Sequence, residues 1–263
     1  MNLELTDQVA VVVGGARGLG HAIATAFAAE GARVALLDVS PDVVAAAERL
    51  GGKGFAIDVT DFAAVRAAAE AIRSHFVRVD HIAFAAGIGS GKFGFPFWKL
   101  DPSEWSRVLN VNLIGAVNVA HAFAPGLAEA RHGTLLFLAS VAGQIGSQTD
   151  PPYSASKAGL INFAQCAAKD LAPFGVRVNA LNPGMVKTPL NKSVWQAWAD
   201  RQPPESRLDY EAWTAEKIAK LVPLNRWQTP EDVAAMAVFL ASERAANVTG
   251  QTINVDGGYV MHS

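Results

Sequence analysis

The sequence predicts an α/β fold built on a mostly parallel sheet that is covered by helices on both faces. Short apolar runs rich in β-branched residues alternate with longer helical patterns along most of the chain. The first unit is a strand, a glycine-rich turn, a helix and a second strand within about 30 residues, the size of a βαβ unit. Continuous apolar runs are typical of strands that are buried on both faces of a sheet.

The elements follow from these patterns in order. We expect seven strands, each a short apolar run, at 8–13, 33–38, 54–57, 81–86, 134–139, 176–181 and 252–255. We expect helices from the glycine turn to Glu30 and at 42–50, 61–76, 102–129, 153–173 and 230–242. Thr229 is the expected N-cap of the last helix, since Pro230 and Glu231 follow it.

Residues 187–222 form an irregular segment with no place in the predicted sheet. A segment of that length is more often functional than idle, so we expect a substrate lid there. It holds three of the six tryptophans, Trp195, Trp198 and Trp213, whose alternative role is lid packing or oligomer contact. No linker, repeat or low-complexity tract divides the chain, and we expect one domain over 1–263.

The composition narrows the classes of partner. The chain has 263 residues, 51% of them hydrophobic, and a formal net charge of −2, which gives no electrostatic reason to expect nucleic acid or an anionic membrane. The single cysteine, Cys166, excludes an intramolecular disulfide, fits a reducing compartment, and is expected to be a small core residue. The N-terminal residues contain no basic stretch before an apolar run, so we expect a cytoplasmic protein. No metal site is expected.

A stretch from Val108 to Ala128 carries no formal charge and is long enough to cross a bilayer. It contains Asn112, two further asparagines, a histidine and a proline, which would be costly in hydrocarbon. We therefore expect a helix that is buried in protein.

The turn after the first strand, "GGARGLGHA", suits a pyrophosphate. Gly14, Gly18 and Gly20 would let the backbone approach the phosphates at the positive end of the next helix, although such turns also serve only to pack a helix on a strand. Asp38 ends the second strand, where a carboxylate can accept hydrogen bonds from the adenosine ribose and would repel a 2′-phosphate. Its alternative role is a loop carboxylate or helix cap. We expect NAD rather than NADP, although Arg17 could tolerate the extra phosphate.

Two further strand ends fit a dinucleotide. Asp58, at the end of the third strand, could receive the adenine amino group beside Val59, whereas Asp61 is the better candidate to cap the next helix. Thr188, in "LNPGMVKTP", follows a Pro-Gly turn and could reach a carboxamide.

The stretch "PPYSASKAGL" places Tyr153 and Lys157 four residues apart, on one face of a helix. A nearby ammonium and an oxidised nicotinamide would lower the tyrosine pKa, ordinarily about 10, toward the range of a general base. Alone, the pair is typical of an ordinary amphipathic helix. Ser140 stands thirteen residues upstream at the carboxyl end of a buried strand, and Asn112 lies inside a predicted helix where it needs a partner.

Together these features resemble the short-chain dehydrogenase/reductase family from about Leu5 to Tyr259. The resemblance implies a Rossmann fold with strand order 3-2-1-4-5-6-7 and a catalytic tetrad of Asn112, Ser140, Tyr153 and Lys157. It also implies contacts to the cofactor from Gly14, Arg17, Gly18, Leu19, Gly20, Asp38, Asp58, Val59, Ala86, Gly87, Tyr153, Lys157, Pro183, Gly184, Val186 and Thr188.

Two positions depart from the family pattern. Val13 replaces the usual threonine at the glycine motif, and Phe84 to Gly87 read F-A-A-G where the family has N-N-A-G. Both changes put the rigidity of the loops around the cofactor in doubt more than the chemistry.

The resemblance implies reversible oxidation of a secondary alcohol to a ketone, with a small-molecule substrate and a homotetramer. We expect a polyol, sugar or cyclic alcohol, selected by residues 88–99 and 187–222. The alternatives are a 3-oxoacyl thioester reductase, a silent NAD-binding protein and, less well matched in its glycine spacing, an NAD-dependent epimerase.

Overall fold

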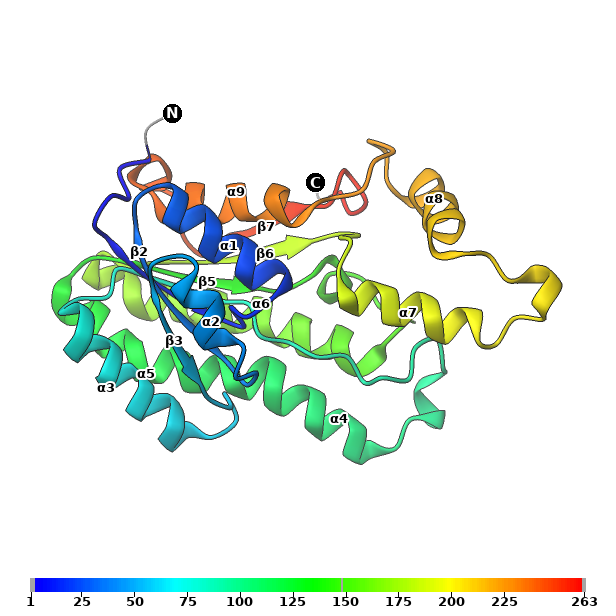
Figure 1. The fold of residues 1–263 in the computed structure, drawn as a ribbon, viewed down its shortest axis with the longest axis horizontal. Coiled ribbons are helices and arrows are strands. Elements are labelled where there is room, and N and C mark those ends of the chain that lie inside the picture. Colours follow the sequence, from blue (N-terminus) through cyan, green and yellow to red (C-terminus); the bar gives the residue numbers. More distant parts are fainter. Residues whose placement is uncertain (1–2, 148, 262–263) are drawn as a thin grey trace.

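Seven parallel strands form one sheet in the computed structural model, which describes residues 3–147 and 149–261 (Figure 1). The strand order is β3-β2-β1-β4-β5-β6-β7, as the resemblance implies. The strands are β1 Val9–Val13, β2 Arg33–Asp38, β3 Lys53–Ala56, β4 His81–Phe84, β5 Thr134–Leu138, β6 Arg177–Pro183 and β7 Thr252–Val255. All seven expected strands are confirmed, with ends that move by no more than about two residues.

Helices cover both faces of this sheet (Figure 1). One face carries α1 Gly18–Ala29, α2 Val43–Glu48 and α9 Pro230–Ala241, and the other carries α3 Phe62–Phe76, α5 Gly115–Ala130 and α6 Pro151–Leu171. The strand β1 shows why both faces are apolar. Val9, Val11 and Val13 belong to one core cluster and Ala10 and Val12 to the other, because successive side chains point to opposite faces.

The chain reverses its direction of travel across the sheet at β1. This strand pairs with β2 on one side and β4 on the other, so the turns after β1 and β4 separate at the carboxyl edge. Such a switch point is where open α/β sheets leave a crevice for ligands.

The expected long helix over 102–129 is interrupted. It consists of α4 Pro102–Leu109, a π-helical turn at Asn110–Ile114, and α5. This combined run, Pro102–Ala130, is long and apolar enough by length and composition to cross a membrane, but a soluble core helix can pass the same test. Only 39% of its most apolar window is buried in the chain, less than we expected.

The region 187–222, expected to be irregular, contains two helices, α7 Pro189–Ala199 and α8 Tyr210–Leu221. Both extend beyond the end of the sheet (Figure 1). Thr188 caps α7 and Asp209 caps α8, each accepting a hydrogen bond from a backbone N–H three residues ahead. These capping residues fix where the two helices begin.

Two other expectations concern helix ends and faces. Thr229 caps α9 through a capping box with Asp232, as expected. The helix α6 begins at Pro151, earlier than expected, because proline is well suited to a first helical turn.

The expectation that Cys166 is a core residue is wrong: it is exposed, on the outer side of α6 between the buried Ala164 and Ala167. Short 3₁₀ turns lie at Phe97–Lys99, Val141–Gly143, Ala172–Phe174, Pro204–Ser206 and Glu243–Ala245.

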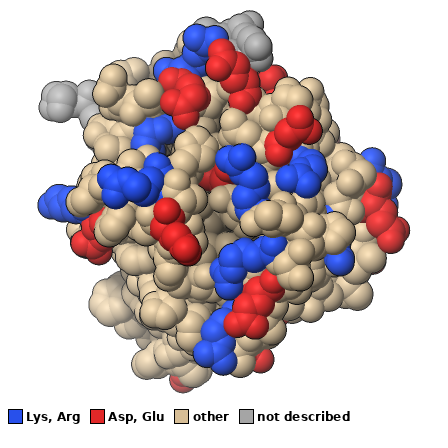
Figure 2. All heavy atoms as spheres, turned by 90° about the vertical axis from the view of Figure 1, so that its left-hand side faces the viewer, with Lys and Arg blue, Asp and Glu red and all other residues tan. Residues whose placement is uncertain are grey.

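Charged side chains of both signs are interspersed on the face shown in Figure 2. Neither sign gathers into one field there, which agrees with a formal net charge of only −2.

Candidate active site

The structure brings Tyr153 and Lys157 to the carboxyl edge of the sheet on the first turns of α6. The Lys157 Nζ atom lies 5.5 Å from the centroid of the Tyr153 ring. It donates a hydrogen bond of 2.7 Å to the carbonyl oxygen of Leu138, the last residue of β5. Lys157 is 3% exposed, so its ammonium is fixed against the end of that strand.

Ser140 lies two residues beyond the end of β5 and caps the 3₁₀ turn at Val141–Gly143. Its Oγ atom accepts a hydrogen bond of 3.1 Å from the Ala142 N–H. It also lies close enough to the Tyr153 phenol to lower the pKa of that phenol. A hydroxyl group and a phenol therefore face one point beside the sheet edge, as the spacing of thirteen residues suggested.

The pKa of Tyr153 differs from the expectation. Burial raises the pKa of Tyr153 to about 12, the Ser140 hydrogen bond lowers it, and the Asp150 carboxylate raises it. Burial also lowers the pKa of Lys157 to about 8. The protein alone therefore does not bring the pKa of the tyrosine toward neutrality, because desolvation of the phenolate outweighs the effect of Ser140.

Asn112 is fully buried at the centre of the π-helical turn. Its Oδ1 atom accepts from the Ile88 N–H at 2.8 Å, and its Nδ2 atom donates to the Ile88 carbonyl at 3.0 Å and to the Ser156 hydroxyl at 2.9 Å. Both amide protons are therefore in use. The side chain links the loop after β4 to α6, which satisfies the need for partners noted from the sequence.

Two positions of the glycine turn, Gly14 and Gly20, leave no room for a side chain. A Cβ atom on Gly20 would lie 2.0 Å from the Gly14 carbonyl oxygen, and one on Gly14 would lie 2.7 Å from the Ala86 nitrogen. Gly14 and Gly18 also adopt positive φ angles of 83° and 60°. The turn thus needs its glycines for close backbone packing and for its conformation.

Asp38 faces this turn. Its Oδ2 atom accepts from the Ala16 N–H at 3.1 Å and its Oδ1 atom from the Ser40 N–H at 3.0 Å. It is the last residue of β2, only partly buried, and does not cap α2. The carboxylate is held at the strand end where an adenosine ribose would lie.

The structure brings some of the remaining predicted cofactor contacts together and not others. A groove of about 820 Å³ is lined by seven of them: Arg17, Gly18, Leu19, Gly87, Tyr153, Lys157 and Thr188. Asp58 instead accepts from the backbone and side chain of Thr60, while Asp61 caps α3, as weighed from the sequence. The side chain of Val186 packs in the core near α9, so only its backbone could touch a ligand.

Four more predicted contacts do not line this groove. Val59 and Ala86 pack at the core, the first buried and the second partly so, and Pro183 ends β6. A Cβ atom on Gly184 would lie 2.7 Å from the Asp256 Cβ atom. Gly184 lines a second, smaller cavity instead.

The groove fits a dinucleotide. Its volume suits a ligand longer than a sugar, and it runs from the first turn of α1 to Tyr153 and Lys157. A Cβ atom on Gly87 would lie 3.3 Å from the Lys157 Nζ atom and 3.5 Å from Asn112 Oδ1, so both polar groups border the glycine loop closely. Among the described residues, no three histidine, cysteine or acidic side chains are placed to hold a metal ion.

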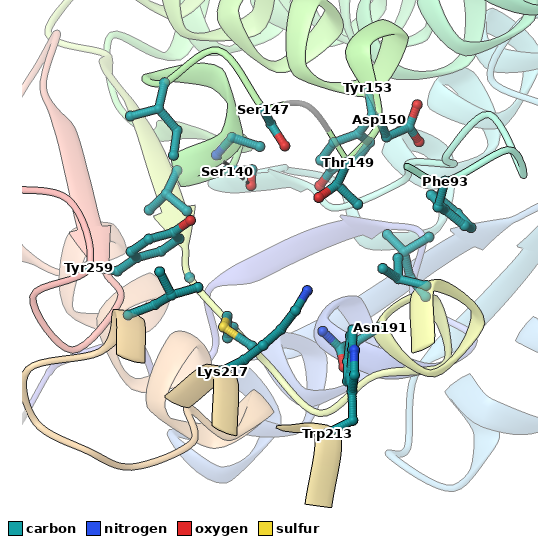
Figure 3. Close-up of a pocket in the computed structure, with 18 residues that line it drawn as sticks. Phe93, Ser140, Ser147, Thr149, Asp150, Tyr153, Asn191, Trp213, Lys217 and Tyr259 are labelled. Carbon is teal, nitrogen blue, oxygen red and sulfur yellow. Dashed lines mark hydrogen bonds between the residues drawn. The ribbon is translucent and has the colours of Figure 1, made fainter. Parts of the chain in front are cut away.

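A second cavity of about 180 Å³ adjoins Tyr153 on its other side (Figure 3). Ser140 and Tyr153 form one wall, and residues of α7 and α8 form the opposite wall. The helix α7 borders both spaces, with Asn191 and Val194 at this pocket and Ser193 and Ala197 at the groove. Tyr153, Phe93 and Leu190 line both, so the two spaces meet at the phenol.

The three tryptophans of 187–222 have different contacts. Trp213 is 4% exposed and lines the pocket, whereas Trp195 donates to the Leu208 carbonyl and Trp198 packs on Trp213. Two of the three therefore pack within this segment, which was the alternative role. Of the expected segment 88–99, Phe93 lines the pocket, and the residues from Gly94 to Trp98 line a separate surface groove.

Three titratable residues of this pocket were not singled out from the sequence: Asp150, Tyr259 and Lys217, the last of which lies within the expected segment 187–222. Lys217 follows Trp213 by four residues, a spacing that places both on one face of a helix and could have indicated it. Asp150 and Tyr259 carry no comparable signal.

The two departures from the family pattern leave the loops fixed. Ala85 donates its N–H to the Val13 carbonyl at 2.8 Å, and Asn112 holds both backbone groups of Ile88. Ser90 donates its N–H to Asp150 Oδ2 at 2.9 Å. Main-chain bonds and Asn112 thus replace the missing threonine and asparagines.

Comparisons with known proteins agree with this architecture. A family model described as "Enoyl-(Acyl carrier protein) reductase" matches residues 14–260. The chain is 34% identical to D-threitol dehydrogenase of Mycolicibacterium smegmatis, over 99% of this chain and 95% of the relative. It is 36% identical to 2-dehydro-3-deoxy-L-rhamnonate dehydrogenase (NAD(+)) of Sphingomonas sp., over 95% and 94%.

Two further matches also cover nearly the whole chain. The chain is 33% identical to 3-oxoacyl-(acyl-carrier-protein) reductase FabG of Thermotoga maritima, over 98% of this chain and all of the relative. The solved structure titled "Crystal structure of gox2181" superposes with a TM-score of 0.84 at 29% identity, over 98% of this chain and 97% of that one. With the parallel sheet, the glycine turn and the Tyr153 and Lys157 pair, these matches show that the chain belongs to the short-chain dehydrogenase/reductase family of nicotinamide-dependent oxidoreductases.

Proposed function

We propose that this chain is an NAD-dependent oxidoreductase that interconverts a secondary alcohol, such as a polyol, sugar or cyclic alcohol, and its ketone. One observation carries the proposal. The Tyr153 phenol lies where the dinucleotide-sized groove meets the small pocket, beside the Ser140 hydroxyl. A proton-transfer group at that junction can reach a substrate in the pocket while the substrate faces the groove.

The four tetrad residues have distinct proposed roles. Ser140 positions the substrate oxygen, and Tyr153 removes its proton during oxidation. Lys157, fixed on the Leu138 carbonyl, holds the cofactor ribose through its remaining donors. Asn112 keeps the loop at Ile88 in place, and its Oδ1 atom retains acceptor capacity for a water that relays the proton. NAD supplies the acceptor for the hydride.

The raised pKa of Tyr153 sets a requirement for this proposal. A phenol with a pKa of about 12 is a weak base near neutral pH, so the positive charge of an oxidised nicotinamide must lower it in the working complex. A cation in the groove acts on the phenolate across a short, poorly solvated distance, where charges interact strongly. The tyrosine is therefore proposed to become active only when the groove is filled.

Asp38 supports NAD as the cofactor. Its carboxylate lies at the end of β2, where it would accept from ribose hydroxyls and repel a 2′-phosphate. Arg17 is exposed at the groove and would be the partner of such a phosphate in the less favoured NADP complex. We further propose that the protein is cytoplasmic and assembles as a homotetramer. Its partner is a small-molecule substrate, and neither nucleic acid nor a membrane is expected to bind. The chain forms one domain, and residues 187–222 are its proposed lid.

A 3-oxoacyl thioester reductase is the second candidate. The relative from Thermotoga maritima and the description of the matching family model favour it, since both name acyl carrier protein. The pocket, with a volume of about 180 Å³, favours a small substrate instead. A silent NAD-binding protein would keep the groove but would have no use for Ser140 beside the phenol.

A spectrophotometric screen tests the proposal. Polyols, sugars, secondary alcohols and 3-oxoacyl thioesters are each supplied with the oxidised or reduced form of NAD and of NADP, and absorbance at the NADH band is followed. We expect NAD-linked oxidation of a small alcohol. Turnover of thioesters alone would favour the second candidate, and an inert protein that still binds NADH would favour the silent one.

The variant Tyr153→Phe tests the role of the phenol. It removes one hydroxyl group and leaves the ring, so we expect turnover to fall by about 10²-fold or more, the usual contribution of a general acid–base. NADH binding, measured by fluorescence titration, serves as the control and should remain within a few-fold of wild type. Near-normal turnover in this variant would contradict the assignment.

A further inference from the structure

The pocket beside Tyr153 has one cation and one carboxylate among the described residues that line it. Lys217 extends from α8 and Asp150 precedes α6, and the remaining lining consists of apolar, hydroxyl, amide and glycine residues. Figure 3 places the two at different walls, with the Lys217 side chain reaching from the lid into the open middle of the pocket. The pocket is therefore electrically polarised, positive at the lid and negative beside Tyr153.

Lys217 has no ion pair within the described part of the chain. Two other lysines do: Lys187 pairs with Glu211 at 2.9 Å and Lys92 with Glu104 at 2.6 Å. The Lys217 Nζ atom instead lies 4.1 Å from the centroid of the Trp213 ring, over its face. A cation on an indole face is attracted by the ring, but the ring cannot neutralise its charge.

Partial burial removes water from the Lys217 ammonium, which destabilises the charged form and lowers the pKa of Lys217. An anion bound at Nζ would offset this destabilisation, because it would supply a counter-charge and a charge-assisted hydrogen bond. Trp213 is itself buried and lines the pocket, so the ammonium over its ring lies at the pocket wall.

We propose that Lys217 binds the carboxylate of a small hydroxy acid and holds the secondary alcohol of that acid at Ser140 and Tyr153. This deepens the proposed oxidoreductase function and rests on it. The substrate would enter with its anionic end at α8, since Asp150 repels a carboxylate from the opposite wall. The volume of about 180 Å³ suits a chain of a few carbons. A single ammonium beside apolar walls suits a carboxylate better than a phosphate, which binds best where several donors converge.

Matched substrate pairs test the proposal. Each pair shares a carbon skeleton and differs only in its end group: threonate with threitol, and gluconate with glucitol, each supplied with NAD. We expect kcat/KM to be at least about tenfold higher for an acid than for its polyol, as one charge-assisted hydrogen bond provides. A matching polyol phosphate forms the third arm.

The variant Lys217→Met should remove this preference. Methionine keeps an apolar stem on Trp213, so the fold should survive, and circular dichroism melting checks that it does. We expect KM for the acid to rise about 10- to 100-fold, with kcat and the KM of the polyol changed by less than about threefold. Lys217→Arg should restore most of the preference for the acid.

Lys220→Met is the matched control, because Lys220 is exposed on the same helix and lies outside the pocket lining. It should behave as wild type with both members of each pair. Equal loss in both lysine variants would show a general electrostatic effect and overturn the proposal.

The outcomes separate this inference from the function on which it rests. Oxidation of neutral polyols without a preference for acids would overturn the role of Lys217 and leave the oxidoreductase proposal intact. A preference for the phosphate, or a Lys217→Met variant that loses kcat equally for acid and polyol, would also overturn it. If no alcohol or acid is oxidised with either cofactor, the proposed function fails and this inference fails with it.

Discussion

Asp38 is the residue that distinguishes the two nicotinamide cofactors in the proposed function. We expect Asp38→Ala to lower kcat/KM with NAD by about 10- to 100-fold, because one or two hydrogen bonds from ribose to a carboxylate are lost. The value with NADP should rise, since the repulsion of a 2′-phosphate disappears. Steady-state kinetics with both cofactors checks this, and Asp42→Ala, on an exposed carboxylate of the next turn, is the control. An unchanged ratio of the two values would contradict the role of Asp38.

At the scale of single residues, the sequence predicts which candidate catalytic residues come together better than it predicts their electrostatics. The spacing of Ser140, Tyr153 and Lys157 follows from strand and helix geometry, and the structure brings these three together. The pKa of Tyr153 depends on burial and on Asp150, a side chain whose position only the folded loop fixes. Lys217 was overlooked for a different reason: a lysine on an amphipathic helix is usually solvated.

At the scale of elements, Arg177 holds the carboxyl end of α9. Its guanidinium, 8% exposed, donates to the carbonyls of Leu240 at 2.7 Å, Ala241 at 3.1 Å and Ser242 at 3.0 Å. These carbonyls lie at or just beyond the end of the helix, where such groups lack partners within it. The arginine reaches them from β6 and so ties the last long helix to the sheet.

We expect Arg177→Met to lower the free energy of unfolding by about 3 kcal/mol, because several buried carbonyls lose a charged donor. Urea unfolding followed by circular dichroism measures this. Arg66→Met, at an exposed position of α3, should change the free energy by less than about 0.5 kcal/mol. Equal stability of the two variants would show that the carbonyls find other partners.

Element boundaries were predictable where local rules act alone, as at the Thr229 cap of α9. The π-helical turn at Asn110–Ile114 was not, because it depends on the bonds of Asn112 to Ile88 and Ser156, which are distant in sequence. The lid helices α7 and α8 begin at capping residues, Thr188 and Asp209, that are also common in loops. Their tertiary packing, such as Tyr210 on Trp195, has no counterpart in the apolar pattern.

At the scale of the whole molecule, His81 makes stability depend on pH. It is 2% exposed in β4 and contacts Thr134 Oγ1 at 2.8 Å and the Gln8 side chain. Burial lowers the pKa of His81 to about 3, while the Asp80 carboxylate opposes this and the cations of His132, Arg177 and Arg78 add to it. Between pH 6.5 and 3 the unfolded chain therefore binds one more proton than the folded chain, and stability falls as the pH falls.

We expect wild type to lose about 2 kcal/mol from this group between pH 7 and pH 5, at roughly 1.4 kcal/mol for each pH unit below the unfolded pKa. His81→Gln should be less stable at pH 7 but should lose less on acidification. Urea unfolding at both pH values measures the difference, and His75→Gln, at an exposed site, should follow wild type. Parallel pH profiles for wild type and His81→Gln would contradict the assignment.

The position of α7 has a consequence for turnover. One side of this helix, with Asn191 and Val194, borders the pocket, and another, with Ser193 and Ala197, borders the groove. Because α7 forms part of both walls, a displacement of this helix would change the pocket and the groove together. Substrate binding and cofactor binding would then be coupled, and α7 is the element through which that coupling would act.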